Sequence, residues 1–137
     1  MSRAEAAAFA ESLEGHEPFF DHEVERPRGR LRVRGYTANV AVPEKMISAA
    51  RAVVFKASRV VVVQEADGLR HVMPGGRREP GESVEATARR ELLEECGWHV
   101  HKLRRFAFLH FQHPEESVQA SEDDFVNILH VAEATQY

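Results

Sequence analysis

The chain has 137 residues, of which 43% are hydrophobic and 29% are charged, and its formal net charge is −4 at pH 7. This length suffices for one globular domain that buries roughly two-thirds of its unfolded surface. The mixed charge excludes a basic surface for duplex nucleic acid, and no apolar run reaches the ~20 residues that cross a bilayer. The single cysteine, Cys96, excludes an internal disulfide framework. Because the N-terminus also lacks a signal-peptide pattern, we expect a cytoplasmic protein.

The N-terminal part, residues 1–29, is predicted to be an extension of a single domain that spans residues 1–137. Ser2 is a residue type that caps helices, and the alanine-rich segment after it predicts a short helix over residues 2–14. Residues 16–29 mix charged side chains with prolines and predict an extended, solvated connector. The histidines of this connector have no partner at a spacing typical of zinc, so the extension offers no metal chemistry.

Strands are predicted in the next part of the chain. Residues 30–42 alternate apolar and polar side chains, interrupted at Gly35, and predict a first strand or one arm of a hairpin. Residues 46–56 and 60–63 are rich in β-branched side chains and predict two strands that are buried in a sheet. This part of the chain therefore predicts sheet rather than helix.

A tight turn is predicted at Asp67-Gly68. The flanking residues 60–65 and 69–73 are predicted to pair as a hairpin that leads into the segment 74–76, Pro-Gly-Gly. Glycine in that segment lets the backbone approach a ligand closely, and a backbone carbonyl can join the ligands of a metal ion.

One helix is predicted with a defined start and a defined end. Ser83 is a favoured N-cap residue, residues 84–96 contain no glycine or proline, and Gly97 accepts the left-handed conformation that commonly follows a helix. Apolar side chains four residues apart form a stripe that can pack against a sheet. The stripe consists of Val84, Ala88, Leu92 and Cys96. Cys96 is therefore expected to be a core thiol rather than a nucleophile.

Three carboxylates, Glu91, Glu94 and Glu95, lie within roughly 100° of one another on this helix, beside the apolar stripe. They repel one another, and they lie near the helix C-terminus, where the macrodipole favours cations. Each effect is worth only some tenths of a kcal/mol, so a solvated acidic face is one interpretation. The other is a divalent cation, because carboxylate oxygens converging from positions i, i+3 and i+4 suit Mg²⁺ or Mn²⁺.

The chain continues with a predicted strand over residues 99–113, an acidic loop over residues 114–124 and a last strand over residues 125–132. His110 and His113 lie near the end of the first of these strands, where a structural role is more common than metal binding. The order of strands, hairpin, helix and two further strands predicts an α+β fold with a mixed sheet.

The residues around the predicted helix resemble the Nudix box, G-x5-E-x7-R-E-U-x-E-E-x-G-U, in which U is a bulky apolar residue. A complete match at fixed spacing is a far more specific signal than a lone glycine motif. The matching residues are Gly76, Glu82, Arg90, Glu91, Leu92, Glu94, Glu95, Gly97 and Trp98. The segment 73–76, Met-Pro-Gly-Gly, also resembles the Leu-Pro-Gly-Gly sequence that leads into the box, whereas His71 stands where the family often has tryptophan.

This resemblance implies a Nudix-type α/β/α sandwich and a Mg²⁺- or Mn²⁺-dependent hydrolase. Such an enzyme cleaves a diphosphate bond in a nucleoside diphosphate linked to another group X, by in-line attack of a metal-activated water on one phosphorus. By their positions in the box, Glu91 and Glu95 are the implied principal metal ligands, joined by Glu94 and the Gly75 carbonyl.

The resemblance also implies a catalytic group made of Glu94, Arg90 and Glu82. Glu94 would be a metal ligand or the general base, Arg90 would orient the glutamates, and Glu82 would support the site. Simpler roles are an i,i+4 pair between Arg90 and Glu94 and an interaction of Glu82 with the helix dipole. In some family members a downstream carboxylate adds a ligand or base, and residues 114–124 hold the candidates here. The candidate phosphate contacts, chosen by charge and expected position, are Arg51, Arg77 and Arg78.

Other classes of function stay open at this point. A Nudix-fold module can sense a nucleotide derivative without cleaving it, although such a sensor can lose the carboxylates that are complete here. An acidic interaction domain would need no metal. The family usually covers the second sheet face with a C-terminal helix, whereas this sequence stops at Tyr137, after a strand. Either the chain is truncated, or the N-terminal helix or a second subunit covers that face. We therefore expect a homodimer formed through the N-terminal helix or the last strand, with a small nucleotide derivative as substrate and no membrane partner.

Overall fold

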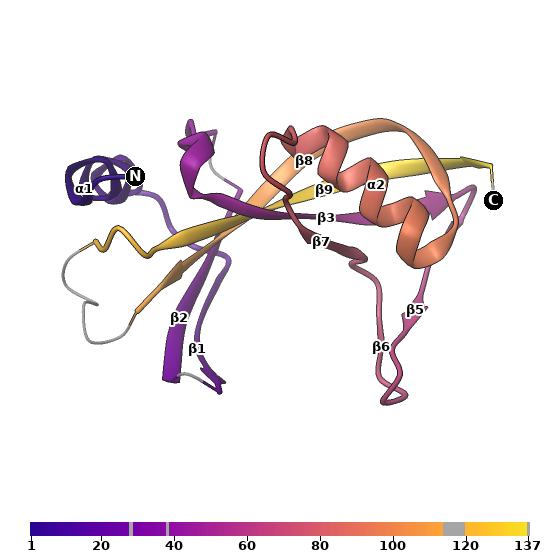
Figure 1. Cartoon of the computed structure of the whole chain (residues 1–137), viewed down its shortest axis with the longest axis horizontal. Coiled ribbons are helices and arrows are strands. Elements are labelled where there is room, and N and C mark those ends of the chain that lie inside the picture. The colour runs from indigo at the N-terminus through magenta and orange to yellow at the C-terminus, as the bar shows by residue number, and fades with distance from the viewer. Residues whose placement is uncertain (28, 38, 114–119, 137) are drawn as a thin grey trace. The chain divides into compact units, whose positions relative to one another are not determined.

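The computed structural model describes residues 1–27, 29–37, 39–113 and 120–136 (Figure 1). The chain forms two compact units. The first contains Met1–Ser48 and Ala107–Asn127, and the second contains Ala49–Phe106 and Ile128–Tyr137. Three long strands contribute residues to both units: β3 (Ile47–Lys56), β8 (His99–Gln112) and β9 (Phe125–Gln136).

The first unit combines an antiparallel sheet with a helix, α1 (Arg3–Ser12). β1 (Phe20–Arg26) and β2 (Gly29–Tyr36) form a hairpin. The other edge of β2 pairs with the last residues of β8, with Arg32 opposite Gln112. A 3₁₀ helix, η1 (Glu44–Met46), precedes β3.

Aromatic side chains build the core of the first unit. The ring centroid of Phe9, in α1, lies 5.9 Å from that of Phe108, which in turn stacks with Tyr36 at 5.5 Å. Phe111 stacks with Phe125 at 4.5 Å. Such pairs contribute about 0.5–1.5 kcal/mol each beyond their buried area. Packing of Phe9 therefore stabilises α1, which is too short to be stably helical by itself.

The predicted N-terminal helix is confirmed. Glu5 N donates a hydrogen bond to Ser2 Oγ at 3.1 Å, and Ser2 N donates to Glu5 Oε2 at 2.6 Å, which completes a capping box. The prediction of a solvated connector over residues 16–29 was wrong, because β1 pairs along its whole length with β2. All residues of β1 except Val24 are exposed, so the apolar alternation that marks a half-buried strand is missing.

The second unit packs a helix, α2 (Val84–Cys96), against a sheet (Figure 1). Its strands follow the order β8, β9, β3, β4 (Arg59–Val60), and β7 (Gly75–Arg77) pairs with β3. The neighbours β9 and β3 run in the same direction, so the predicted α+β fold with a mixed sheet is confirmed. The core joins one residue of α2 to residues of the strands: Leu92 with Ala52, Val54, Val100, Ala132 and Ala134.

A separate two-stranded sheet, β5 (Val63–Gln64) and β6 (Arg70–His71), extends from the second unit (Figure 1). The predicted turn at Asp67-Gly68 is confirmed, and Gly68 has a positive φ of 86°. The prediction of a buried strand over residues 60–63 was wrong, because Val62 is 52% exposed and only short pieces of this segment are paired. The β-branched run therefore belongs to an exposed hairpin.

The last strand extends beyond the predicted residues 125–132, and the chain itself covers its apolar side chains. Ile128 and Leu129 point to opposite faces of β9, yet they are only 2% and 4% exposed. This removes part of the reason for expecting a homodimer, which stays a prediction. No helix in the described part of the chain is long and apolar enough to cross a membrane.

Candidate active site

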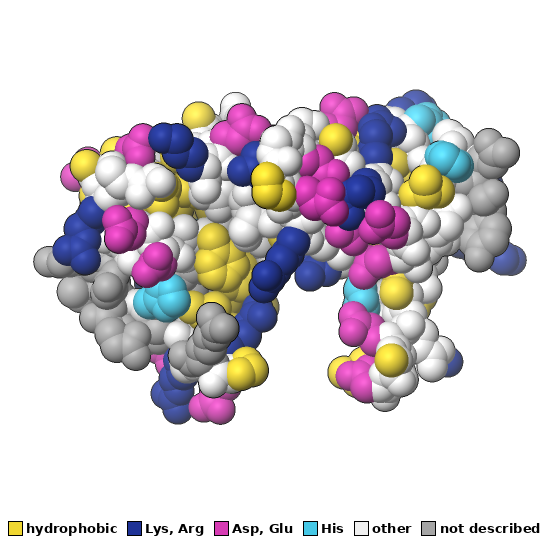
Figure 2. Space-filling view, in the orientation of Figure 1, with side chains coloured by type: hydrophobic (Ala, Val, Ile, Leu, Met, Phe, Trp, Pro, Cys, Tyr) yellow, Lys and Arg dark blue, Asp and Glu magenta, His cyan; other side chains and the backbone are white. Residues whose placement is uncertain are grey.

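α2 begins and ends where the local sequence signals place it. Ser83 Oγ accepts a hydrogen bond from Ala86 N at 3.0 Å, and Gly97 ends the helix with a φ of 74°. The apolar stripe faces the core, since Val84, Ala88 and Leu92 are buried. The charged residues consequently lie along the remaining surface of α2, where Figure 2 shows acidic and basic side chains gathered side by side.

One arginine connects most of these charged side chains. Arg90 Nε and Nη2 donate to the two oxygens of Glu82, at 2.7 and 3.0 Å. Arg90 Nη1 donates to Glu91 Oε1 at 2.9 Å and to Glu94 Oε2 at 3.1 Å, and Nη2 also donates to the Arg77 carbonyl oxygen at 2.9 Å. All five N–H groups of the guanidinium are thereby used. The structure thus brings together the three residues expected to form the catalytic group, and Glu91 with them.

Glu82 is held in its ionised form by this arrangement. Its side chain is 14% exposed and accepts two further hydrogen bonds, from Glu79 N at 3.1 Å and from Thr87 Oγ1 at 2.7 Å. The Arg90 guanidinium, followed by these two donors, lowers the pKa of Glu82 from 4.5 to about 2. The hydrogen bonds from Arg90 to Glu82, and then to Glu91, raise the pKa of Arg90 in turn. The pair therefore stays charged at any pH at which the protein is expected to work.

Replacing Arg90 with glutamine is expected to raise the pKa of Glu82 toward its ordinary value, because the first cause of the lowered pKa is removed. A carboxylate with a lowered pKa stabilises the fold above its unfolded pKa, near 4.5, and this contribution is lost as the pH falls from there toward 2. NMR titration of the Glu82 carboxyl carbon measures the pKa directly. Arg89→Gln is the matched control, since Arg89 pairs with Glu85 instead. An unchanged Glu82 pKa in Arg90→Gln would contradict the assignment.

The backbone of β7 passes directly against two of the carboxylates. Gly75 N donates to Glu95 Oε2 at 2.7 Å. A Cβ atom at Gly76 would lie 2.5 Å from Glu91 Cδ and 2.6 Å from each of its oxygens, so a side chain here would displace the end of the Glu91 side chain. Pairing with β3 holds β7 at this place. Glu91 and Glu95 therefore face the same short strand, although β7 and α2 are separated in the sequence by a loop.

The residues at this place fit a hard divalent cation. Glu91, Glu94 and Glu95 supply carboxylate oxygens, and β7 supplies backbone carbonyls, which are the ligand types that Mg²⁺ and Mn²⁺ prefer. In the observed arrangement these carboxylates contact Arg90 and the Gly75 amide. No three His, Cys, Asp or Glu side chains in the described ranges form a ready-made ligand group. Rotation of the glutamate side chains would be needed, and Glu94, whose side chain is 60% exposed, has room for it.

The three arginines predicted as phosphate contacts have different surroundings. Arg51, on β3, donates from Nη1 to the Met73 carbonyl oxygen at 3.2 Å and lies opposite Gly75 in the sheet. Arg77 is exposed, and its carbonyl oxygen accepts from Arg90. Arg78 is partly buried. Arg51 pairs with Gly75 across the sheet, and Arg77 and Arg78 directly follow Gly76 in the chain. A role of the three arginines in phosphate binding stays a prediction.

Thr87 is a part of the site that the sequence analysis missed. Its side chain is fully buried, and its hydroxyl lies 2.7 Å from Glu82 Oε1 and 2.9 Å from the Ser83 carbonyl oxygen. Thr87 is therefore a positioning residue for Glu82. The sequence feature that could have identified this role is a threonine within one turn of the helix start, beside the buried apolar stripe, because a buried hydroxyl needs a hydrogen-bond partner.

Three further predictions concern residues outside this cluster. Cys96 is half-buried, its thiol lies 2.9 Å from the Leu92 carbonyl oxygen, and burial raises its pKa, as expected for a core thiol.

In the acidic segment, residues 114–119 lie outside the described residues. Asp124 is 4% exposed and accepts from Ser121 N at 3.2 Å, so it closes a turn. His110 is also buried, at 2% exposure.

Comparison with protein families matches residues 45–136 to the NUDIX domain. Among solved structures, a variant of the Bacillus subtilis pyrophosphohydrolase BsRppH superposes with a TM-score of 0.63 at 17% identity, over 84% of this chain and 66% of that chain. A NUDIX hydrolase from Nitrosomonas europaea gives a TM-score of 0.49 at 20% identity, over 66% of this chain and 61% of that chain. The chain thus spans less than two-thirds of either protein's length. No curated protein sequence matches the chain.

Proposed function

Because the chain belongs to the Nudix family, which its match over residues 45–136 shows, we propose that it is a Mg²⁺-dependent pyrophosphohydrolase. The substrate class is a nucleoside diphosphate linked to a further group X, and the bond cleaved is the anhydride bond of the diphosphate. The fold similarity to a protein named as a pyrophosphohydrolase supports this reaction class.

The observation that carries the proposal is the set of five hydrogen bonds from Arg90. They hold Glu82, Glu91 and Glu94 on one side of α2 with all guanidinium donors used. An acidic face with only a solubility function has no need of a partly buried arginine that orders its carboxylates. Ordering of this kind is what a preorganised catalytic site requires.

In this function Glu91 and Glu95, with the Gly75 carbonyl oxygen, would hold the cation. The bound cation neutralises phosphate charge and lowers the pKa of a water molecule. Glu95 is placed by its hydrogen bond from Gly75 N, and Glu91 by Arg90 and the space left at Gly76. Both carboxylates thus start from defined places beside β7, from which their side chains would rotate to meet the cation.

Glu94 is the proposed general base, because it is the most exposed of the carboxylates that accept hydrogen bonds from Arg90. The oxygen of a water molecule forms a bond to one phosphorus while the bond from that phosphorus to the bridging oxygen breaks. The proton of the water passes to Glu94, and the bridging oxygen leaves with the electron pair. Arg90 and Glu82 are positioning residues, and Arg51, Arg77 and Arg78 are the proposed phosphate contacts.

Hydrolysis is expected to require a divalent cation. The test uses ADP-ribose, a dinucleoside polyphosphate, a nucleotide sugar, an oxidised nucleoside triphosphate and capped RNA, each with Mg²⁺ and with Mn²⁺. We expect turnover of at least one compound, its loss in excess EDTA and its recovery when Mg²⁺ is added back. Full turnover in EDTA would contradict the proposal. Tight binding of one compound without turnover would favour the alternative, a Nudix-fold sensor of a nucleotide derivative.

Two further parts of the proposal concern the setting of the protein. We propose a cytoplasmic location, since a single, half-buried cysteine suits a reducing compartment. We also retain a homodimer, with α1 or β9 in the interface, although most of the apolar side chains of β9 are already buried in the chain.

A further inference from the structure

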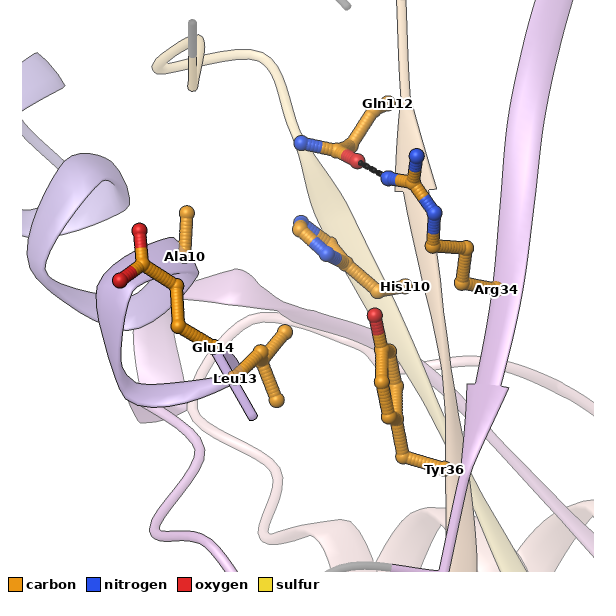
Figure 3. A pocket seen from close by; sticks show the side chains of 7 residues that line it. All are labelled: Ala10, Leu13, Glu14, Arg34, Tyr36, His110 and Gln112. Atoms are coloured by element: carbon orange, nitrogen blue, oxygen red, sulfur yellow. Dashed lines mark hydrogen bonds between the residues drawn. The ribbon is translucent and has the colours of Figure 1, made fainter. Parts of the chain in front are cut away.

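A second group of polar side chains surrounds a cavity of about 200 Å³ in the first unit (Figure 3). The cavity lies between the end of α1 and the strands β2 and β8. It is smaller than the roughly 300–1,000 Å³ of pockets that hold drug-sized ligands, so it suits a small molecule. None of its lining residues belongs to the Nudix box. Those that matter here are Ala10, Leu13, Arg34, Tyr36, His110 and Gln112.

Gln112 and Arg34 present hydrogen-bond donors to this cavity. Gln112 is 7% exposed, and its Oε1 accepts from Arg34 Nη1 at 2.6 Å. With the amide oxygen used in this way, the amide nitrogen of Gln112 points toward the side where α1 lies (Figure 3). Arg34 also lies 3.5 Å from Asp21, so its positive charge is partly balanced. The two strands therefore offer one cation and one buried amide donor.

His110 adds a buried ring nitrogen that has no hydrogen-bond partner among the described residues. The residue is 2% exposed, and its Nε2 lies 3.7 Å from Asp124 Oδ2, which is longer than a hydrogen bond. The ring packs edge-on against Phe9 at 5.3 Å. Buried polar atoms in folded proteins nearly always have a partner, and Asp124 Oδ1 also lacks one, so this buried pair has hydrogen-bonding capacity left for a polar group beside the ring.

The remaining walls define the charge and the shape of such a ligand. Tyr36 is 6% exposed, and burial raises the pKa of its hydroxyl, which therefore stays a donor. Leu13 and Ala10 make the wall on the α1 side apolar. Glu14, at the same end of α1, is negatively charged and opposes any anion, the more strongly the higher the charge of that anion. Donors on one side, an apolar wall on the other and a single balanced arginine favour a monoanion with a short hydrocarbon body.

We propose that this cavity is a binding site for a small organic molecule with one carboxylate group. The carboxylate accepts hydrogen bonds from Arg34 and Gln112, because guanidinium and amide N–H groups match the planar carboxylate. The hydrocarbon part packs against Leu13 and Ala10. This site does not depend on the proposed phosphate chemistry at α2, and it can be tested on protein that has no hydrolase activity.

The test is an NMR titration of the whole chain with butyrate, butan-1-ol and inorganic phosphate as separate probes. Butyrate is expected to shift the side-chain signals of Gln112 and His110 in a saturable way. Butan-1-ol has the same hydrocarbon body without the carboxylate, and phosphate has the charge without the body, so both are expected to bind at least about tenfold more weakly. Equal binding of the alcohol, or tighter binding of phosphate, would overturn the proposal.

Two variants and one matched control locate the site. Arg34→Gln is expected to weaken butyrate binding at least about tenfold, because a charge-assisted hydrogen bond is lost. Arg30→Gln removes the same charge from the same strand at an exposed position outside the cavity, and is expected to leave binding unchanged. Ala10→Leu fills the cavity from α1 without removing a polar group and is expected to abolish binding. If Ala10→Leu binds butyrate as the unmodified chain does, or if both arginine variants weaken binding equally, the cavity is not the site.

Discussion

Replacing Glu95 with glutamine is expected to lower kcat by about two to three orders of magnitude, the scale typical for loss of one preorganised charged group in an active site. The change removes a negative charge that the proposed cation needs. The fold should be kept, because the glutamine amide oxygen can still accept the hydrogen bond that Gly75 N donates at 2.7 Å. Loss of like-charge repulsion with Glu91, four residues earlier, should leave the helix at least as stable.

Glu85→Gln is the matched control for this experiment. Glu85 lies on the same helix, and the substitution removes the same charge, but its carboxylate pairs with the exposed Arg89 at 2.9 Å. We expect kcat of the control to stay within about twofold of the unmodified chain, since exposed pairs of this kind contribute little. Steady-state kinetics and thermal melts of both variants give the comparison. Equal activity of the two variants, or a melted Glu95→Gln variant, would remove Glu95 from the site.

Replacing Gly75 with alanine is expected to destabilise the protein by about 3 kcal/mol or more, at the upper end of single substitutions. The φ of Gly75 is 154°, and a Cβ atom there would lie 2.2 Å from the Ala50 carbonyl oxygen and 2.6 Å from Arg51 Cα. These are backbone atoms of β3, so β7 would have to move away from its partner. The hydrogen bond from Gly75 N to Glu95 would be lost with it, and activity should fall together with stability.

Gly81→Ala is the matched control, because it measures the cost of the positive φ angle without a steric clash. Gly81 has a φ of 79°, also in the left-handed region, but a Cβ atom there meets nothing within 4 Å. We expect Gly81→Ala to cost about 1–2 kcal/mol, the cost of the left-handed conformation alone. Urea unfolding of both variants measures the difference in the free energy of unfolding. If Gly75→Ala is no less stable than Gly81→Ala, β7 does not pass as close to β3 as described.

α2 and its charged edge could be predicted because their signals lie close together in the chain. Ser83 and Gly97 cap the helix through contacts within a few residues, and the spacing of Glu91, Glu94 and Glu95 is a property of any helix. The start of α1 at its cap Ser2 could be predicted for the same reason. The complete Nudix box then identified the family, which the match over residues 45–136 confirms.

The wrong predictions concern strands whose pairing and burial are not decided by the local sequence. β1 carries charged residues on both faces and is a strand because β2 offers it a partner edge. The apolar run over residues 60–63 suggested a buried strand, yet Val60 and Val62 stay exposed because the chain leaves β3 after a short pairing. Strand pairing depends on residues that are distant in sequence, so local propensity predicts it poorly.

The sequence by itself therefore determined the family, the helix that carries the carboxylates and the residue types of the site. Only the tertiary structure decided which groups hold those carboxylates in place. Glu95 accepts a hydrogen bond from Gly75, twenty residues earlier, and the end of the Glu91 side chain lies against Gly76 in β7, the strand that pairs with β3. Such contacts form when loops close and the core excludes water. The residues that are brought together in this way show no periodic pattern in the sequence from which their contact could be predicted. The cavity lined by Arg34, Gln112 and His110 likewise exists only because α1 packs on strands far from it in the sequence.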